Sequence, residues 1–447
     1  MRPVHVQNER GRWGRDDLVR RLCHALDIAK LVGDHLAASG YDDLRDPAKC
    51  IRPEKVVSET AVLLVAASSL LTYPEIETRI RHLAEQLIPH ARSERTRLGL
   101  CLQPAVAWDY AVPHVCLSRL GYRDSQFDEL LQQSLNSQAH AGRERAPHRA
   151  LEQEWSAMGL SGPKPGRRSR TPNTARISAL NHPMNLLTGT RDDVYAFTHA
   201  LMYVTDFNLY PAPLPRQRSV ILAEAEALLA RSLDEQDYDL SGEILLSWPL
   251  TGKSWGPTSA FGFKVLAHVE DEAGFLPTPS TRISELKALQ DSDRTKYLLA
   301  TAYHTAYVMG LVCAASLQPG CAPPASIGTK KSKPGSAQQI LKLLDLGERE
   351  SHWSNEFSRL AQAEADALSG FLINIALHRR TARRDFGGLT EILELAYELE
   401  LANTPAASQA AEMLQRVTTY ARIRGNPTAS LHCAWDRCPE VPQQTTR

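Results

Sequence analysis

The stretch from residue 191 to residue 207, RDDVYAFTHALMYVTDF, has two contrasting faces when wound as an α-helix at about 100° per residue. One face is an apolar stripe, made of Val194, Phe197, Leu201 and Val204. The opposite face carries groups that donate, accept or move protons, namely Tyr195, His199, Tyr203 and Asp206. A surface helix usually has Lys and Glu opposite its core stripe. The pattern therefore predicts an inner helix of a helical barrel, packed outward and facing a polar lumen.

The rest of the chain repeats the helical period, and we find no convincing run of alternating strand residues. Paired helical segments recur, joined by short turns of Gly, Asp and Pro such as residues 121–124 and 271–277. This predicts an all-α fold of stacked helical hairpins, either an open solenoid or an α/α toroid closed around a lumen.

Breaks in the periodicity predict the domain organisation. Helical hairpins are expected over residues 1–159, followed by a flexible basic linker over 160–180. Further hairpins over 181–424 would continue the same toroid, and an irregular tail would follow over 425–447. Residues 318–336, rich in Pro and Lys, are expected to form a second mobile loop.

Composition narrows the class of protein. A chain of 447 residues with 43% hydrophobic and 23% charged residues is typical of a soluble globular protein. Its formal net charge of zero gives no reason to expect nucleic acid or an anionic membrane as partner. The apolar run near residues 61–71 is too short to span a bilayer, and residues 1–10 lack a signal-peptide core. We expect a cytoplasmic protein; the oligomeric state is left open.

Eight cysteines are spread along the chain, mostly in apolar contexts where a free thiol behaves as a small hydrophobe. Cys433 and Cys438 form a close pair that would suit half a metal site or a disulfide. A zinc site needs four ligands, and no second Cys or His pair lies nearby. Two ordinary tail thiols are the favoured interpretation.

Acidic groups in apolar surroundings mark two further segments. Glu59 is the only acidic residue between two apolar runs, residues 56–57 and 61–65. Its pKa would be raised if it were buried unpaired; the alternative is an ion pair with Lys55 one turn earlier. Asp239 and Glu243 lie a turn apart on one helix face. Two such carboxylates repel each other unless they have a cation, a shared proton or open water nearby. A metal ion or paired acid–base chemistry would use them; the alternative is an acidic helix edge exposed to solvent.

Histidines supply the remaining candidates. His304 lies in a long, mainly apolar helix with Tyr307, and is either a hydrogen-bonded core residue or part of a site. His199 shares its face with Tyr203, and Asp206 would orient its imidazole and raise its basicity. Buried polar networks also hold helices in register, which is the structural alternative.

Established motifs are absent, including the dinucleotide-binding glycine motif, the P-loop, the nucleophile elbow and the His-Glu-x-x-His zinc motif. The run from 234 to 239 looks superficially like the acidic motif of proton-initiated terpene cyclases. It lacks their Asp-x-Asp-Asp spacing, so no protonation role is carried over. Aromatic residues, at 6%, are also few for a pocket that binds a carbocation.

Four short segments carry a family resemblance: Thr198-His199 with Thr205-Asp206-Phe207, Tyr238-Asp239-Leu240 with Glu243, residues 274–277, and Tyr303-His304-Thr305. Across roughly residues 50–315 the chain resembles an uncharacterised bacterial family of helical proteins associated with natural-product gene neighbourhoods. The resemblance implies an α/α toroid of the general kind used by terpene and lanthionine cyclases. It supplies no catalytic residue.

The preferred hypothesis is a tailoring enzyme that acts on a small molecule or peptide in a helical-barrel lumen. Acid–base chemistry without any cofactor or metal would perform a cyclisation, isomerisation or elimination. We expect His199 to be the main base or acid, Tyr203 its partner donor and Asp206 its orienter. His304 and Asp239 would form a second pole across the lumen, and the expected substrate-binding residues are Tyr195, Glu59, Glu243 and Tyr307.

Two alternatives remain open. One is a non-catalytic helical-repeat scaffold that binds a peptide or carrier protein on its concave face. The other is a metal-dependent hydrolase, with ligands drawn from His199, Asp206, Asp239 and Glu243. We also predict the geometry of the site: the side chains of His199, Tyr203, Asp206 and His304 should converge on one cavity.

Overall fold

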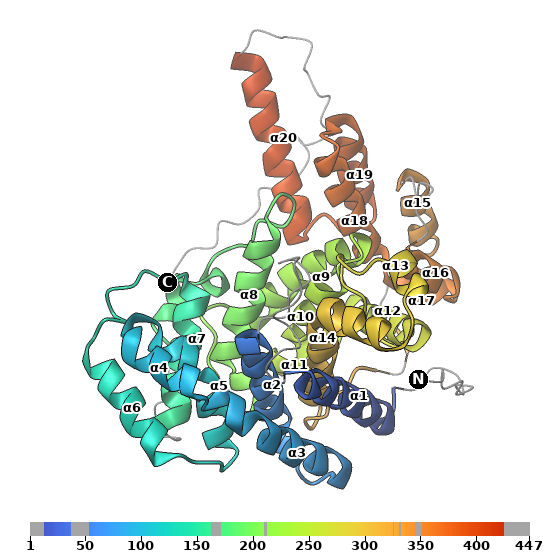
Figure 1. Ribbon diagram of the computed structural model, residues 1–447. Coiled ribbons are helices and arrows are strands. Elements are labelled where there is room, and N and C mark those ends of the chain that lie inside the picture. The colour runs from blue at the N-terminus through green and yellow to red at the C-terminus, as the bar shows by residue number, and fades with distance from the viewer. Residues whose placement is uncertain are drawn as a thin grey trace.

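The computed structural model describes residues 13–36, 53–161, 171–209, 212–324, 326–329, 332–344 and 351–423. All regular secondary structure in these residues is helical, which confirms the all-α prediction (Figure 1). The α-helices are α1 (Arg15–Asp34), α2 (Pro53–Ala67), α3 (Pro74–Ala91), α4 (Glu94–Leu102), α5 (Ala107–Arg119), α6 (Ser125–Asn136), α7 (Pro147–Ser161), α8 (Arg191–Val204), α9 (Arg218–Asp234), α10 (Tyr238–Leu245), α11 (Ser247–Thr251), α12 (Pro257–Ala273), α13 (Ile283–Ala288), α14 (Asp291–Ser316), α15 (Ser336–Leu343), α16 (His352–Ser358), α17 (Gln362–Ala367), α18 (Ser369–Ala382), α19 (Phe386–Glu398) and α20 (Pro405–Ile423). Short 3₁₀ helices are η1 (Ser68–Leu70), η2 (Pro104–Val106), η4 (Thr174–Ile177), η5 (Ala179–Asn181) and η6 (Asp206–Asn208).

Six helices form a ring in which each packs against the next. The order around the ring is α2, α5, α7, α8, α10 and α14, and α14 closes it by contacting both α10 and α2. Helix α1 packs along the outside of α14, and α3 packs against α1, α2 and α5. The ring comprises only these six helices. An α/α toroid formed by the whole chain stays a prediction.

From Tyr297 to its end, helix α14 is apolar nearly all round, which is why this part lies inside the fold. The segment Ser292–Ser316 is long and apolar enough to cross a membrane by length and composition alone. In the structure, 72% of its most apolar window is buried among other helices. A core helix of a folded domain explains this composition without a bilayer.

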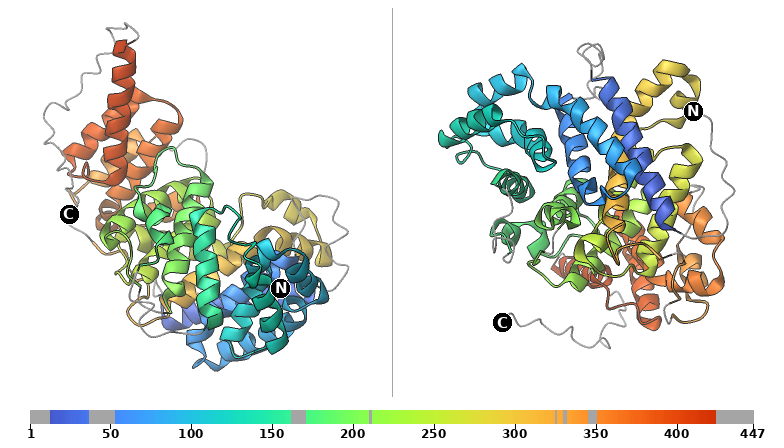
Figure 2. Two further views of the ribbon diagram at one scale, coloured as in Figure 1. Left: turned by 90° about the vertical axis from the view of Figure 1, so that its left-hand side faces the viewer. Right: turned by 90° about the horizontal axis from the view of Figure 1, so that it is seen from below.

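The C-terminal helices form a separate layer. Helices α18 and α20 pack on α9, and α16 packs on α12, so this layer extends away from the ring (Figure 2). The predicted 160–180 linker begins inside α7, and its described part carries η4 and η5, where Ala175 and Leu180 are buried. The Arg-rich residues 162–170 and the predicted tail, with Cys433 and Cys438, lie outside the described residues.

Asp366 joins α17 to α15 by capping the start of α15. Its carboxylate accepts hydrogen bonds from the backbone N–H groups of Gly335 (2.9 Å) and Ala337 (3.0 Å), and from the Gln362 side chain (3.1 Å). Burial alone would raise the pKa of Asp366, but these hydrogen bonds outweigh it and lower the pKa. The cap therefore stabilises the folded state in its ionised form.

We expect Asp366→Ala to lower the free energy of unfolding by about 1–3 kcal/mol at neutral pH. Because the folded-state pKa is lowered, this stabilisation is present above the unfolded pKa of about 3.9 and is lost as the pH falls through the folded-state value. Guanidinium unfolding of both proteins at neutral and acidic pH measures the difference, which should shrink below about pH 4. A difference that does not change with pH would contradict this account.

Candidate functional site

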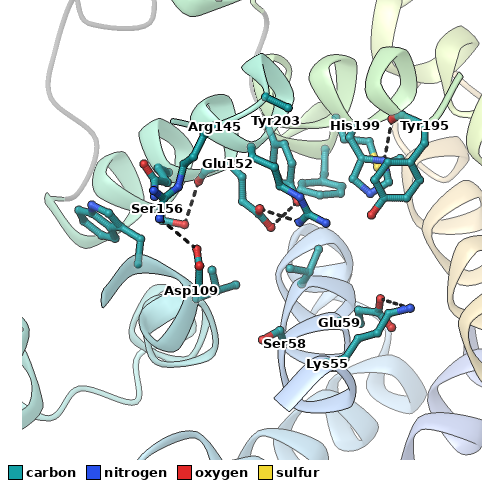
Figure 3. Close-up of a pocket in the computed structure, with 18 of the residues that line it drawn as sticks. Lys55, Ser58, Glu59, Asp109, Arg145, Glu152, Ser156, Tyr195, His199 and Tyr203 are labelled. Carbon is teal, nitrogen blue, oxygen red and sulfur yellow. Dashed lines mark hydrogen bonds and ion pairs between the residues drawn. The ribbon is translucent and has the colours of Figure 1, made fainter. Parts of the chain in front are cut away.

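A cavity of about 600 Å³ lies within the six-helix ring, and all six helices contribute to its lining. Figure 3 shows Lys55 and Glu59 on α2 facing Tyr195 and His199 on α8, with Glu152 of α7 along the same wall as α8. The apolar stripe of α8 is buried on the other side, with Phe197 fully inaccessible. The two-faced pattern of this helix therefore follows from packing outward while lining a cavity, as the sequence predicts.

Most of the predicted site residues meet at this cavity. Those that line it are Glu59, Tyr195, His199, Tyr203, Glu243, His304 and Tyr307. Asp239 lies behind the wall, where it contacts His304. Asp206 does not line the cavity, so the predicted convergence holds for His199, Tyr203 and His304 and is wrong for Asp206.

His304 of α14 is the centre of a carboxylate cluster. Its Nδ1 atom lies 3.2 Å from Oε2 of Glu59 on α2. On the other side of the imidazole, its Nε2 atom lies 3.4 Å from Oδ1 of Asp239 and 3.8 Å from Oε1 of Glu243, both on α10. The segments that the sequence analysis singled out separately thus form one cluster, held by three different helices.

His199 of α8 joins the same cluster through Glu243. Its Nδ1 atom lies 3.0 Å from the backbone oxygen of Tyr195 and 3.5 Å from Oε2 of Glu243. Both neighbours are acceptors, so Nδ1 carries the proton and Nε2 is left as an acceptor in the neutral ring. The Tyr195 ring stacks on this imidazole with centroids 3.6 Å apart. Oε2 of Glu243 also accepts a hydrogen bond from Thr198 Oγ1 at 2.5 Å.

The pairing of Glu59 decides its charge state. Burial alone would raise its pKa, but the charge and hydrogen bonds of His304, helped by Lys55, outweigh burial and lower the pKa. The Lys55 Nζ atom lies 3.5 Å from Oε1 of Glu59, so the predicted ion pair within α2 is present. The pKa of His304 is raised well above its usual value, because Asp239 and Glu59 outweigh the opposing effect of burial.

Asp239 and Glu243 are not a solvated acidic edge, since both are buried. Burial and repulsion from Glu243 raise the pKa of Asp239 despite the opposing charge of His304. Burial also acts to raise the pKa of Glu243, but His199 and His304 outweigh it and lower that pKa. Arg191, at the start of α8, binds Oδ2 of Asp239 at 2.8 Å and Oδ2 of Asp237 at 2.9 Å.

Tyr203 and Asp206, the predicted hydrogen-bond partners of His199, bind other residues, although the Tyr203 ring packs against the imidazole with centroids 6.1 Å apart. The Tyr203 hydroxyl donates to Oε1 of Glu152 at 2.7 Å, and burial raises its pKa well above the usual value. Asp206 follows the end of α8, where the chain reverses, and it binds both Nη atoms of Arg119 at 2.9 Å. It also accepts a hydrogen bond of 2.6 Å from Trp155 Nε1. The carboxylate near Nδ1 of His199 is that of Glu243, at 3.5 Å, and not that of Asp206 as expected.

One part of the cavity wall is basic and could not be predicted from the sequence. Arg145 and Arg149 line the cavity, and Arg149 Nη1 binds Oε2 of Glu152 at 2.9 Å. Nothing in this polar segment distinguishes it from an ordinary surface helix. Thr198 and Arg191 were also missed, although both lie in the two-faced segment next to residues that were singled out.

The profile of the family described as Domain of unknown function (DUF6895) matches residues 25–314, and the chain belongs to this family. The matched region contains five of the ring helices whole, α14 as far as residue 314, and every residue of the His304 cluster. No curated protein and no solved structure matches the chain.

Proposed function

We propose that this member of the DUF6895 family is an enzyme that performs acid–base chemistry on a small molecule bound in the six-helix cavity. One observation carries the proposal: four helices bring two imidazoles and three carboxylates together at one wall of that cavity. Burying so many titratable groups is unfavourable for stability unless they are well paired. Their concentration beside a cavity is typical of an active site.

His199 is the group that moves the proton in this proposal. With Nδ1 donating to the Tyr195 backbone oxygen, Nε2 is free to accept a proton from a substrate. The imidazolium that forms is stabilised by Glu243, whose Oε2 atom lies 3.5 Å from Nδ1. Stacking on the Tyr195 ring holds the imidazole plane. Cyclisations, isomerisations and eliminations can all begin with such a proton abstraction.

The size of the cavity favours a small molecule, and two arginines on its wall offer a place for an anionic group. A volume of about 600 Å³ lies in the range of small-molecule sites, which argues against a peptide or carrier protein as the occupant. Arg145 and Arg149 line the wall away from the His304 cluster, each beside one carboxylate, Asp109 at 3.7 Å and Glu152 at 2.9 Å. Their remaining N–H groups suit a carboxylate or phosphate group of the substrate. The natural-product association implied by the family resemblance directs the choice of test compounds to the products of neighbouring genes.

We expect His199→Gln to lower turnover by at least about 100-fold while leaving the melting temperature nearly unchanged. The full chain is incubated with the neighbouring-gene products and with pooled anionic metabolites. Mass spectrometry with chromatographic separation detects conversion, including isomers of equal mass. His82→Gln is the matched control, because His82 is exposed on α3 and outside the cavity lining.

Equal turnover in the His199→Gln and wild-type proteins would reject the role of His199. A wild-type protein that converts none of these compounds but binds a peptide with a defined stoichiometry would favour the scaffold alternative instead.

A further inference from the structure

We propose that Asp239, Glu243 and His304 bind one divalent transition-metal ion of the zinc type between α10 and α14. Each of the three side chains offers one potential ligand atom, and these three atoms lie within 4.8 Å of one another. This inference goes beyond the acid–base role proposed above, and it departs from the sequence-based expectation of a metal-free site. It can be tested without any turnover.

The distances from His304 to the two carboxylates are close to those between ligands of a single ion. A four-coordinate zinc ion with bonds of about 2.0–2.2 Å places neighbouring ligand atoms about 3.3–3.6 Å apart. Nε2 of His304 lies 3.4 Å from Oδ1 of Asp239 and 3.8 Å from Oε1 of Glu243. One imidazole and two carboxylates are ligands that zinc and neighbouring metals accept, whereas Ca²⁺ and Mg²⁺ prefer oxygen alone. Three protein ligands leave a fourth position for water or substrate.

The two carboxylates each have one satisfied oxygen and one unsatisfied oxygen. Oδ2 of Asp239 binds Arg191, and Oε2 of Glu243 accepts from Thr198. Oδ1 of Asp239 and Oε1 of Glu243 are buried and accept no hydrogen bond from the described residues, although their side chains are only 8% and 1% exposed. Leaving buried charged oxygens unsatisfied is strongly unfavourable. Both face the same nitrogen, which is where a cation would satisfy them.

Glu59 fixes the orientation of His304. Oε2 of Glu59 lies 3.2 Å from Nδ1, so a proton on Nδ1 faces this carboxylate and the Nε2 lone pair then faces α10. A neutral imidazole in that position presents a lone pair to two carboxylate oxygens, which repel it unless a cation lies between them. Glu59 is therefore a positioning residue for the ligand His304.

The charges around the cluster also balance with a divalent ion. The carboxylates of Glu59, Asp237, Asp239 and Glu243 face two cationic side chains, those of Lys55 and Arg191. With both imidazoles neutral, two negative charges remain in a largely buried region. A divalent cation removes this excess. A doubly protonated His304 is the metal-free arrangement that the experiment must distinguish.

The test measures metal binding by the purified full chain. After chelator treatment and dialysis, Zn²⁺ is titrated in competition with a chromophoric chelator, and emission spectroscopy gives the metal content. We expect one ion per chain and a higher melting temperature with the ion than without it. Co²⁺ in place of Zn²⁺ should give the visible absorption of a four-coordinate site.

The Zn²⁺ affinity of single variants distinguishes the metal ligands from other residues of the cavity. Glu243→Gln and His304→Gln should weaken Zn²⁺ affinity by more than about 100-fold, and Glu59→Gln by about 10–100-fold. Asp109→Asn, which removes an exposed carboxylate of the same cavity, should leave the affinity unchanged. Circular dichroism of each metal-free variant verifies that it is folded, and Glu59→Gln serves as the informative variant if a ligand variant does not fold.

A folded wild-type protein that binds neither Zn²⁺ nor Co²⁺ would overturn the inference and leave the doubly protonated His304 as the correct arrangement. Equal affinity in the wild-type and Glu243→Gln proteins would overturn it as well. Loss of turnover in His199→Gln with metal binding retained would support both proposals, whereas metal binding without any turnover would reject the enzyme proposal alone.

Discussion

Replacing Asp206 by alanine is expected to lower the free energy of unfolding by about 3–5 kcal/mol. The substitution removes both carboxylate oxygens that bind Arg119, whose side chain is only 14% exposed, and the acceptor of the Trp155 indole N–H. A buried charge and a buried donor are then left without these partners. Guanidinium unfolding followed by circular dichroism measures the loss. The left-handed backbone of Asp206, with φ of 49°, adds strain in an alanine variant.

Two comparisons isolate the cause. Asp206→Asn retains an acceptor and tolerates the backbone conformation but lacks the charge, so it should lose less stability than the alanine variant. Asp109→Asn, an exposed carboxylate, should change stability by no more than about 0.5 kcal/mol. If Asp206→Ala were fully stable yet inactive, the sequence-based catalytic hypothesis for Asp206 would be correct and our structural interpretation wrong.

Replacing Glu270 by leucine is expected to destabilise the protein by about 3 kcal/mol. Arg21 on α1 is fully buried, and it forms an ion pair with the buried Glu270 of α12. Its second partner, Asp271 at 2.7 Å, is partly exposed and remains in the variant, which keeps the loss at the lower end of the range for a broken buried pair. Guanidinium unfolding again provides the measurement.

A double variant distinguishes the effect of leaving one buried charge unpaired from the effect of removing the whole ion pair. Arg21→Met combined with Glu270→Leu removes both buried charges and should recover much of the stability that Glu270→Leu loses. Glu272→Ala, an exposed carboxylate on the same helix, should have little effect. If the loss of unfolding free energy in the double variant equalled the sum of the losses in the two single variants, Arg21 and Glu270 would not be coupled.

The helical period explains why the α8 face was predictable. Side chains three and four residues apart must share a face, so the sequence places Tyr195, His199 and Tyr203 together wherever the helix lies. Asp206 does not share this face, because the helix ends before it. Helix α8 ends at Val204, and three successive non-glycine residues then adopt positive φ. Without a Gly or Pro at this point, the sequence gives no local signal for that end.

Partners from other helices were not predictable in the same way. Glu59 and His304 were each singled out for being polar in apolar segments, but their contact depends on how α2 packs on α14. Periodicity identifies the face of a helix and not the helix that covers it. Arg21 and Glu270 were missed for the same reason, since each looks like an ordinary surface charge until α1 and α12 are placed.

The closing position of α14 in the ring has a consequence for synthesis on the ribosome. Helices α2, α5, α7, α8 and α10 all precede α14 in the chain, and α14 is the element that contacts both α10 and α2. At about 5–20 residues per second, the carboxylates of Glu59, Asp239 and Glu243 emerge well before His304. A nascent chain that has not reached α14 has neither a closed cavity nor the imidazole that these acids face. The ring can therefore close, and its acids can gain His304, only after α14 has been synthesised near the end of the DUF6895 region.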